Sequence, residues 1–159
     1  VEEELPWLLQ FHDESGFTYR LTDLATHPMD KVNKVFYIGE HEKLLRIEAH
    51  LNQHYGDRLN VTFSLPDCLE VMHAGVHKGN AVRAVLAQHG LDMSQAVAFG
   101  DGMNDFEMLD MVGRGVVMGN AHDRLKLALP AHEQTLSSDE DGVAVYLEQL
   151  FALSTAGAA

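Results

Sequence analysis

Three side chains with oxygen ligands occur in one short segment of the sequence. The segment VAFGDGMND, at residues 97–105, contains Asp101, Asn104 and Asp105. An apolar run ends at Gly100 and breaks into a Gly-Asp-Gly turn before an amphipathic helix, so Asp101 is expected at the carboxyl end of a strand. Open α/β sheets bind ligands at that end, and carboxylate and amide oxygens suit Mg²⁺. The alternative is that Asp101 and Asp105 only form the turn and cap the helix of an ordinary loop.

A lysine is predicted at another strand-to-helix junction. In LEVMHAGVHKGNAVRAVLAQHG, an apolar strand pattern at residues 69–74 is followed by Gly75, and Lys78 then begins a helical pattern. The dipole at the start of a helix favours anions, so this position does not stabilise a cation. Stabilising a phosphoryl group next to Asp101 and Asn104 would explain the lysine. The alternative is a solvated loop lysine.

The order and spacing of four segments carry a family resemblance. These are GVHKG, VAFGDGMNDFEML, GVVMGNAHDRLK and SSDEDGVAVYLEQLF. Together they resemble the haloacid dehalogenase superfamily, Cof-type branch. The resemblance implies that Lys78 is catalytic and contacts the phosphoryl group, that Asn104 contacts the phosphate, and that Asp101 binds Mg²⁺. It also implies that Asp105 is catalytic and supports the metal site without binding the metal directly.

The implied reaction is Mg²⁺-dependent hydrolysis of a small phosphorylated metabolite through an aspartyl-phosphate. Overall resemblance points to hydroxymethylpyrimidine pyrophosphate, an intermediate of thiamine synthesis, as the substrate. The family's first motif, Asp-x-Asp-Gly-Thr, supplies the nucleophile, and no such segment occurs in this sequence. The nearest match begins at Asp139 in DEDGV, but polar residues precede it, and it corresponds to the family's loop before the last helix.

The chain is therefore expected to be the carboxyl-terminal part of a phosphatase, inactive by itself, whose partner is the missing amino-terminal half. The alternative is a complete, non-catalytic module that binds phosphorylated metabolites or a protein partner. A fragment of a P-type ion pump, which shares the GDGxND pattern, is a weaker third interpretation. The short chain after this motif, with no membrane-spanning run, argues against it.

Two regions are expected to position these residues. In the first, the pattern predicts a strand at residues 32–38, a helix at 40–55 and a strand at 59–65, after a short helix at 5–11 and a strand at 17–21. From Cys68 onward strands and helices alternate, which predicts a parallel sheet. Those elements are expected at residues 69–74, 78–89, 96–99, 105–112, 116–118, 121–128 and 143–151.

The fold class predicted is α/β. Residues 68–159 are expected to form the second half of a doubly wound, Rossmann-like parallel-sheet core. Residues 1–67 are expected to form part of an α+β cap domain of the C2 type.

Composition limits the partners. The 159 residues include 11 Lys and Arg against 24 Asp and Glu, a formal charge of -13. This charge argues against nucleic acid and anionic membranes as partners. A single cysteine, Cys68, excludes a disulfide within the chain and fits a reducing compartment, so we expect a cytoplasmic protein.

Three other residues invite a chemical interpretation. His73 and His77 flank the turn before Lys78, but they lack the spacing and companion ligands of a zinc site. Met103 lies inside the GDGMND turn and could face a substrate. The other methionines near this motif are expected in helix or strand cores.

Overall fold

The computed structural model describes residues 9, 16, 18–28 and 30–152, and the chain divides into two compact units. The first unit is Val1–Asn33, and the second is Lys34–Ala159. In the first unit a turn follows Asp23, whose Oδ1 accepts a hydrogen bond from the Ala25 amide at 2.9 Å. The predicted helix at residues 5–11 lies, except for Leu9, outside the described residues. Residues 18–21 are in no strand, so the strand predicted there is wrong for these residues.

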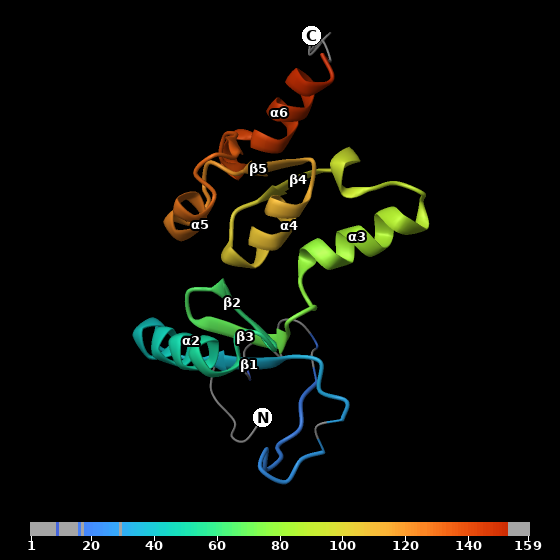
Figure 1. Ribbon diagram of the computed structural model, residues 1–159. Coiled ribbons are helices and arrows are strands. Elements are labelled where there is room, and N and C mark those ends of the chain that lie inside the picture. Colours follow the sequence, from blue (N-terminus) through green and yellow to red (C-terminus); the bar gives the residue numbers. More distant parts are fainter. Residues whose placement is uncertain (1–8, 10–15, 17, 29, 153–159) are drawn as a thin grey trace. The chain divides into compact units, whose positions relative to one another are not determined.

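The second unit contains two separate sheets (Figure 1). In the first sheet, β3 (Cys68–His73) lies between β1 (Val35–Ile38) and β2 (Leu59–Leu65) and is antiparallel to both. Helix α2 (His41–Tyr55) packs against this sheet. Leu44 of the helix meets Phe63 and Leu69 in a small buried core.

The strand at Cys68–His73 was predicted in the parallel sheet, and this prediction is wrong. Only Pro66 and Asp67 separate β2 from β3. Parallel neighbours need a crossover of about a dozen residues or more, whereas a two-residue connection turns the chain straight back. The strand β3 therefore completes the first sheet, and the boundary between the two sheets lies after His73 rather than at residue 67. The division into cap and core domains stays a prediction.

The second sheet is parallel, with the order β4 (Val97–Gly100), β5 (Arg114–Val117), β6 (Glu133–Gln134). Its helices are α3 (Lys78–Gln88), α4 (Phe106–Met111), α5 (Asp123–Ala128) and α6 (Gly142–Leu150), and 3₁₀ turns lie at Met103–Asp105 and Ser138–Glu140. The predicted α/β class and its parallel sheet are confirmed. The short strand β6 was not predicted.

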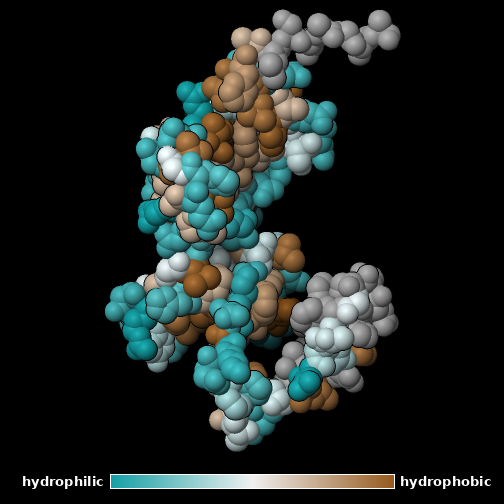
Figure 2. All heavy atoms as spheres, turned by 90° about the vertical axis from the view of Figure 1, so that its right-hand side faces the viewer, coloured by the Kyte–Doolittle hydropathy of each residue, from teal (hydrophilic) through white to brown (hydrophobic). Residues whose placement is uncertain are grey.

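One hydrophobic core supports the second sheet. Leu109 of α4 and Leu125 of α5 are fully buried with Val117 of β5. Exposed apolar residues gather near α6, where Figure 2 shows brown side chains toward the carboxyl end of the chain; they include Leu136, Val143 and Phe151. No helix in the described part of the chain has the length and apolar character needed to span a membrane.

The core predicts a large contrast between two leucines. Leu109→Ala should lower the free energy of unfolding by about 2–5 kcal/mol, because it removes buried methyl groups and leaves a cavity. Leu127 is 80% exposed on α5, so Leu127→Ala should change it by less than about 0.5 kcal/mol. Urea unfolding measures both. Equal losses for the two variants would contradict this assignment of the core.

Candidate active site

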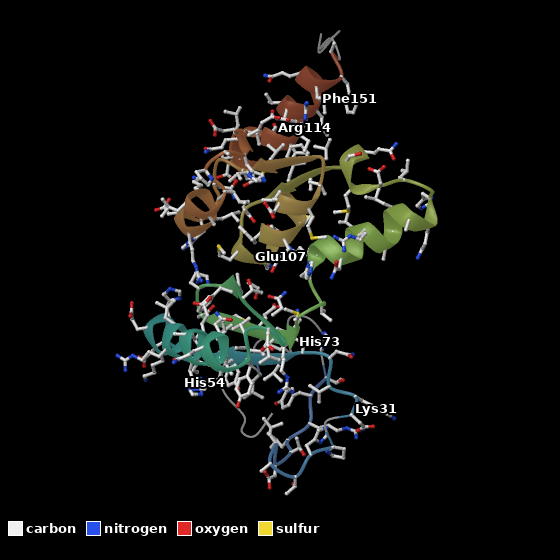
Figure 3. All side chains as sticks on the ribbon, viewed as in Figure 1. Lys31, His54, His73, Glu107, Arg114 and Phe151 are labelled. Atoms are coloured by element: carbon white, nitrogen blue, oxygen red, sulfur yellow. The ribbon has the colours of Figure 1, made fainter. Side chains whose placement is uncertain are left out.

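Helix α3 begins close against α4 because its second residue is a glycine. A Cβ added at Gly79 would lie 2.6 Å from Met111 Sδ and 2.9 Å from the carbonyl oxygen of Glu107. Glu107 is labelled on α4 in Figure 3, close to the start of α3. Backbone packing at this distance leaves no room for a side chain, so Gly79 brings the neighbouring Lys78 beside the loop that precedes α4.

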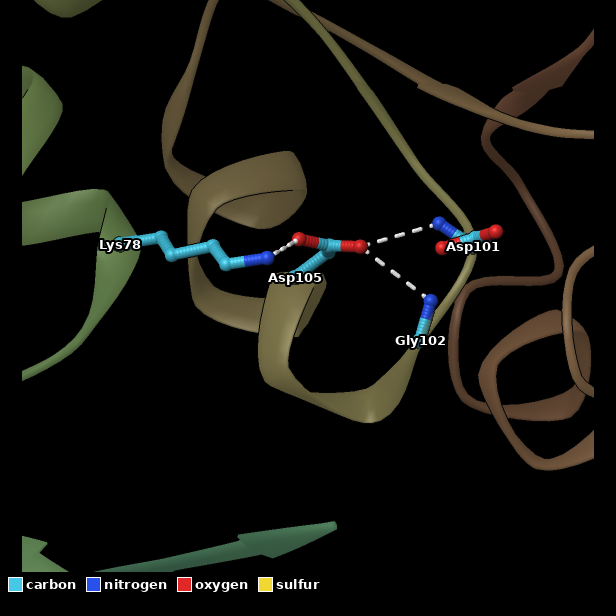
Figure 4. Close-up of polar contacts among 4 residues, drawn as sticks. All are labelled: Lys78, Asp101, Gly102 and Asp105. Atoms are coloured by element: carbon cyan, nitrogen blue, oxygen red, sulfur yellow. Dashed lines mark hydrogen bonds and ion pairs between the residues drawn. The ribbon is translucent and has the colours of Figure 1, made fainter. Parts of the chain in front are cut away.

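The carboxylate of Asp105 joins the two predicted motifs (Figure 4). Lys78 Nζ forms an ion pair with Asp105 Oδ1. Asp105 Oδ2 accepts hydrogen bonds from the backbone amides of Asp101 at 3.0 Å and Gly102 at 3.2 Å. Asp105 is only 5% exposed. A buried charge is costly unless it is paired and hydrogen-bonded, and here one cation and two amides satisfy it.

A second glycine makes room for this carboxylate. A Cβ at Gly100 would lie 2.5 Å from Asp105 Cβ and 2.8 Å from Asp105 Oδ2. Gly100 is the last residue of β4. Because it has no side chain, the Asp105 carboxylate can lie over the carboxyl end of β4. The turn at residues 100–105 therefore encloses a buried carboxylate. In an ordinary loop, Asp105 would only form the turn or cap the helix.

Asp101 is exposed and is oriented by a residue that the sequence analysis missed. Asn120 Nδ2 donates a hydrogen bond to Asp101 Oδ2 at 2.9 Å, and Asn120 Oδ1 accepts one from the Ser138 amide at 2.9 Å. The backbone carbonyl of Asp101 accepts one from the His122 amide at 2.9 Å. Asn120 follows β5 in the chain, and its place beyond the carboxyl end of the next parallel strand was the signal that could have identified it.

Asn104 lies in the same turn as Asp101 and Asp105. Its Oδ1 would be 2.7 Å from a Cβ added at Gly102, so it lies over the backbone of the turn. No hydrogen bond joins the Asn104 side chain to Lys78, Asp101 or Asp105 within the described part of the chain. The structure thus connects Lys78, Asp101 and Asp105 directly and places Asn104 next to them.

The donor set at this edge fits Mg²⁺ in part. Asp101 Oδ1 accepts no hydrogen bond from the residues that the structure describes, which leaves one carboxylate oxygen for a cation. Across those same residues, no group of three or more His, Cys, Asp or Glu side chains could hold a metal ion. Mg²⁺ is often held by one or two carboxylates together with waters and substrate phosphates, so Asp101 could provide one protein ligand.

Asp139, Glu140 and Asp141 of the DEDGV segment lie before α6, as expected of the loop that precedes the last helix, whereas Gly142 and Val143 already belong to α6. Ser137 Oγ donates a hydrogen bond to Glu140 Oε2 at 2.8 Å, and the Ser137 amide donates one to the same oxygen at 3.2 Å. These bonds hold the pKa of Glu140 below its usual value. Asp139 is exposed in this 3₁₀ turn, and Asp141 immediately precedes α6 with a φ of 55°. Asp139 thus lacks the buried strand that would present a nucleophile.

Two histidines before α3 and the cysteine of β3 have local structural explanations. His77 Nδ1 accepts a hydrogen bond from the Asn80 amide at 3.3 Å and so caps α3, while His73 Nδ1 accepts one from the Gly75 amide at 3.3 Å. Cys68 is buried, and burial raises the pKa of its thiol. A raised pKa disfavours the thiolate that nucleophilic or metal chemistry requires.

Comparison with known proteins bears out the resemblance. The HMP-PP phosphatase of Citrobacter koseri is 47% identical over 127 residues, which are 79% of this chain and 46% of that protein. Solved haloacid dehalogenase-like hydrolases are similar to the chain. That of Bacteroides thetaiotaomicron has a TM-score of 0.66 at 34% identity, over 94% of this chain and 56% of that one. That of B. subtilis has a TM-score of 0.73 at 27% identity, over 87% and 49%.

The chain spans about half the length of these relatives. The family described as haloacid dehalogenase-like hydrolase matches residues 6–147. That range includes Lys78, Asp101, Asn104, Asp105 and Asn120. The chain therefore belongs to the haloacid dehalogenase-like hydrolases.

Proposed function

We propose that the protein containing this chain is a Mg²⁺-dependent phosphatase that acts on a small phosphorylated metabolite through an aspartyl-phosphate. The observation that carries the proposal is the ion pair of Lys78 with the buried Asp105, formed beside Asp101 at the carboxyl end of a parallel strand. A lysine, a metal-ligating carboxylate and a nearby amide are the groups that phosphoryl transfer needs, since its catalysis depends on positioning and charge stabilisation. The similarity to an HMP-PP phosphatase supports hydroxymethylpyrimidine pyrophosphate as the substrate.

In this proposal each residue of the candidate site has a separate role. Asp105 holds Lys78 in place, and the ammonium group of Lys78, whose side chain is about half exposed, neutralises the transferring phosphoryl group. Asp101 would bind Mg²⁺, which supplies further charge stabilisation of the phosphoryl oxygens. Asn120 fixes the Asp101 carboxylate from one side. Asn104 donates a hydrogen bond to the phosphate from its place in the turn.

The nucleophile is proposed to come from outside these 159 residues. They contain no Asp-x-Asp-Gly-Thr segment, and the relatives are about twice as long as the matched region. The described part of the second sheet has β4 at an edge, where a further parallel strand can pair. A strand there would end at the same edge as Asp101 and could present an aspartate to the phosphoryl group.

The acidic charge and the free cysteine support two further proposals. A formal charge of -13 disfavours nucleic acid and anionic membranes as partners. An anionic substrate would therefore need local positive charge, which Lys78 and Mg²⁺ would supply. The buried free thiol of Cys68 fits a reducing compartment, so we place the protein in the cytoplasm.

The proposed source of the nucleophile predicts that the 159-residue chain alone has no phosphatase turnover at saturating Mg²⁺. The longer protein that contains it should hydrolyse hydroxymethylpyrimidine pyrophosphate, and removing Mg²⁺ with a chelator should abolish this activity. Phosphate release measures both proteins. Turnover by the isolated chain at rates typical of enzymes would refute the proposed nucleophile. A longer protein that binds the substrate without turnover would support the non-catalytic module.

Lys78→Ala in the longer protein should lower kcat by about a hundredfold or more, the cost of removing one electrostatic stabiliser of the transition state. It should also lower the free energy of unfolding by about 1–3 kcal/mol, because the buried Asp105 carboxylate loses a partner. The matched control is Lys43→Ala, which removes an exposed lysine paired with Glu40 at 2.9 Å. The control should leave kcat and stability unchanged within error. If Lys78→Ala keeps the wild-type kcat, Lys78 takes no part in catalysis and only pairs with Asp105.

A further inference from the structure

Two exposed histidines lie one helical turn apart on α2. The helix contains the segment HLNQH, so His50 and His54 are four residues apart. Residues at this spacing lie on the same face of a helix, with about 5–6 Å between their Cβ atoms. The ring centroids of the two histidines lie 4.3 Å apart, with an interplanar angle of 35°. Both residues are exposed, so one ion from solvent could contact both rings.

A backbone contact determines which nitrogen of His54 is available. Its Nδ1 lies 2.8 Å from the carbonyl oxygen of His50. A carbonyl oxygen only accepts, so Nδ1 carries the hydrogen and donates it. In the neutral ring the free lone pair is then on Nε2. Histidines that bind metals usually donate their other ring N–H to a carbonyl or carboxylate in this way, which fixes the orientation of the ring.

Both rings offer a nitrogen to a ligand. Among the residues that the structure describes, no hydrogen bond occupies the ring of His50 or the Nε2 atom of His54. His54 lies in the last turn of α2, which ends at Tyr55. The carboxyl end of a helix carries partial negative charge and stabilises cations beside it. A lone pair on each ring next to this helix end favours a cation as the ligand.

The ligand type selects the metal. Imidazole nitrogen suits Zn²⁺, Ni²⁺ and Cu²⁺, whereas carboxylate oxygen and water suit Mg²⁺. The pair would therefore bind a different ion from the one proposed at Asp101. Zn²⁺ takes histidine nitrogens at about 2.0–2.1 Å and prefers four ligands. In the part of the chain that the structure describes, no third His, Cys, Asp or Glu joins the pair, so water would fill the remaining positions.

The residue after His50 limits the chemistry of such a site. In the HExxH motif of metalloproteases, two histidines at this spacing bind Zn²⁺, and the glutamate after the first one is the general base. Leu51 occupies that position here and is half-buried. The pair thus has the ligands of the motif without its base. A bound ion would join two successive turns of α2 and stabilise the end of the helix.

A second histidine pair shows that the spacing alone is insufficient. His73 and His77 are also four residues apart, but His73 is the last residue of β3 and His77 precedes α3. The Nδ1 atom of each accepts a hydrogen bond from a backbone amide. No ring contact joins these two histidines among the described residues. Figure 3 labels His54 on α2 and His73 at the end of β3.

We propose that His50 and His54 form a Zn²⁺-binding site, separate from the Mg²⁺ site proposed at Asp101. The ion binds Nε2 of His54 and one ring nitrogen of His50, and waters complete its coordination. The site stabilises the carboxyl-terminal turns of α2 and does not depend on the proposed phosphatase function. Other cations that prefer imidazole, such as Ni²⁺, would bind in the same place.

The test is a calorimetric titration of the longer protein with Zn²⁺ at saturating Mg²⁺, which occupies the site proposed at Asp101. His50→Ala and His54→Ala should each weaken Zn²⁺ binding by about tenfold or more, because the ion loses one of two linked ligands. Zn²⁺ should raise the Tm of the wild-type protein, since a ligand of the folded state stabilises it, and this increase should be smaller in both variants.

Two controls separate a paired site from general histidine binding. His73→Ala should leave the Zn²⁺ affinity unchanged. The double variant Asn52→His/His54→Asn keeps the number of histidines but places them two residues apart, where side chains do not face each other, and it should bind as weakly as His54→Ala.

The proposal is overturned if the wild-type protein does not bind Zn²⁺, or if its affinity is unchanged in His50→Ala or His54→Ala. Wild-type affinity in the double variant would show that the helical pairing is not needed. A loss in His73→Ala equal to that in His54→Ala would likewise contradict the assignment to His50 and His54.

Discussion

The buried carboxylate of Asp105 is the constraint on which the candidate site depends. A charge that is only 5% exposed needs compensation close by, and the chain supplies it from two places, the Lys78 ammonium group and the amides at residues 101 and 102. These contacts fix the start of α3, the end of β4 and the turn before α4 relative to one another. Gly79 and Gly100 permit the close backbone approach that this arrangement requires.

The parallel sheet explains why the polar side chains of the candidate site lie together at one edge of the sheet. Asp101 follows β4 and Asn120 follows β5, so both emerge where neighbouring parallel strands end, and the hydrogen bond between them links the two loops. The Ser138 amide extends this link to the loop before α6. In a chain with a formal charge of -13, an anionic substrate needs a local cation, and Lys78 lies within this cluster because Asp105 holds it there.

The sequence predicted the parallel strands β4 and β5 and the positions of Lys78, Asp101 and Asp105 at the ends of strands, because apolar runs that end in glycine turns have a local signature. It did not predict the Lys78–Asp105 pair, which depends on the separation of α3 and α4. The strand at Cys68–His73 was misplaced because an apolar run fits either sheet, and only the short Pro66–Asp67 connection decides between them. Asn120 was missed because an asparagine in a turn already has a local explanation.

We propose that the Asp105 carboxylate orders a metal-dependent phosphatase site. The most direct measurement is the Mg²⁺ dependence of phosphate release by the longer protein carrying Asp105→Asn, which keeps the shape of the side chain and removes its charge. Asp110→Asn, an exposed aspartate on the same helix α4, is the control. We expect Asp105→Asn to lower kcat at saturating Mg²⁺ by about a hundredfold or more and the control to leave kcat unchanged. Wild-type kcat and Mg²⁺ dependence in Asp105→Asn would contradict this proposal.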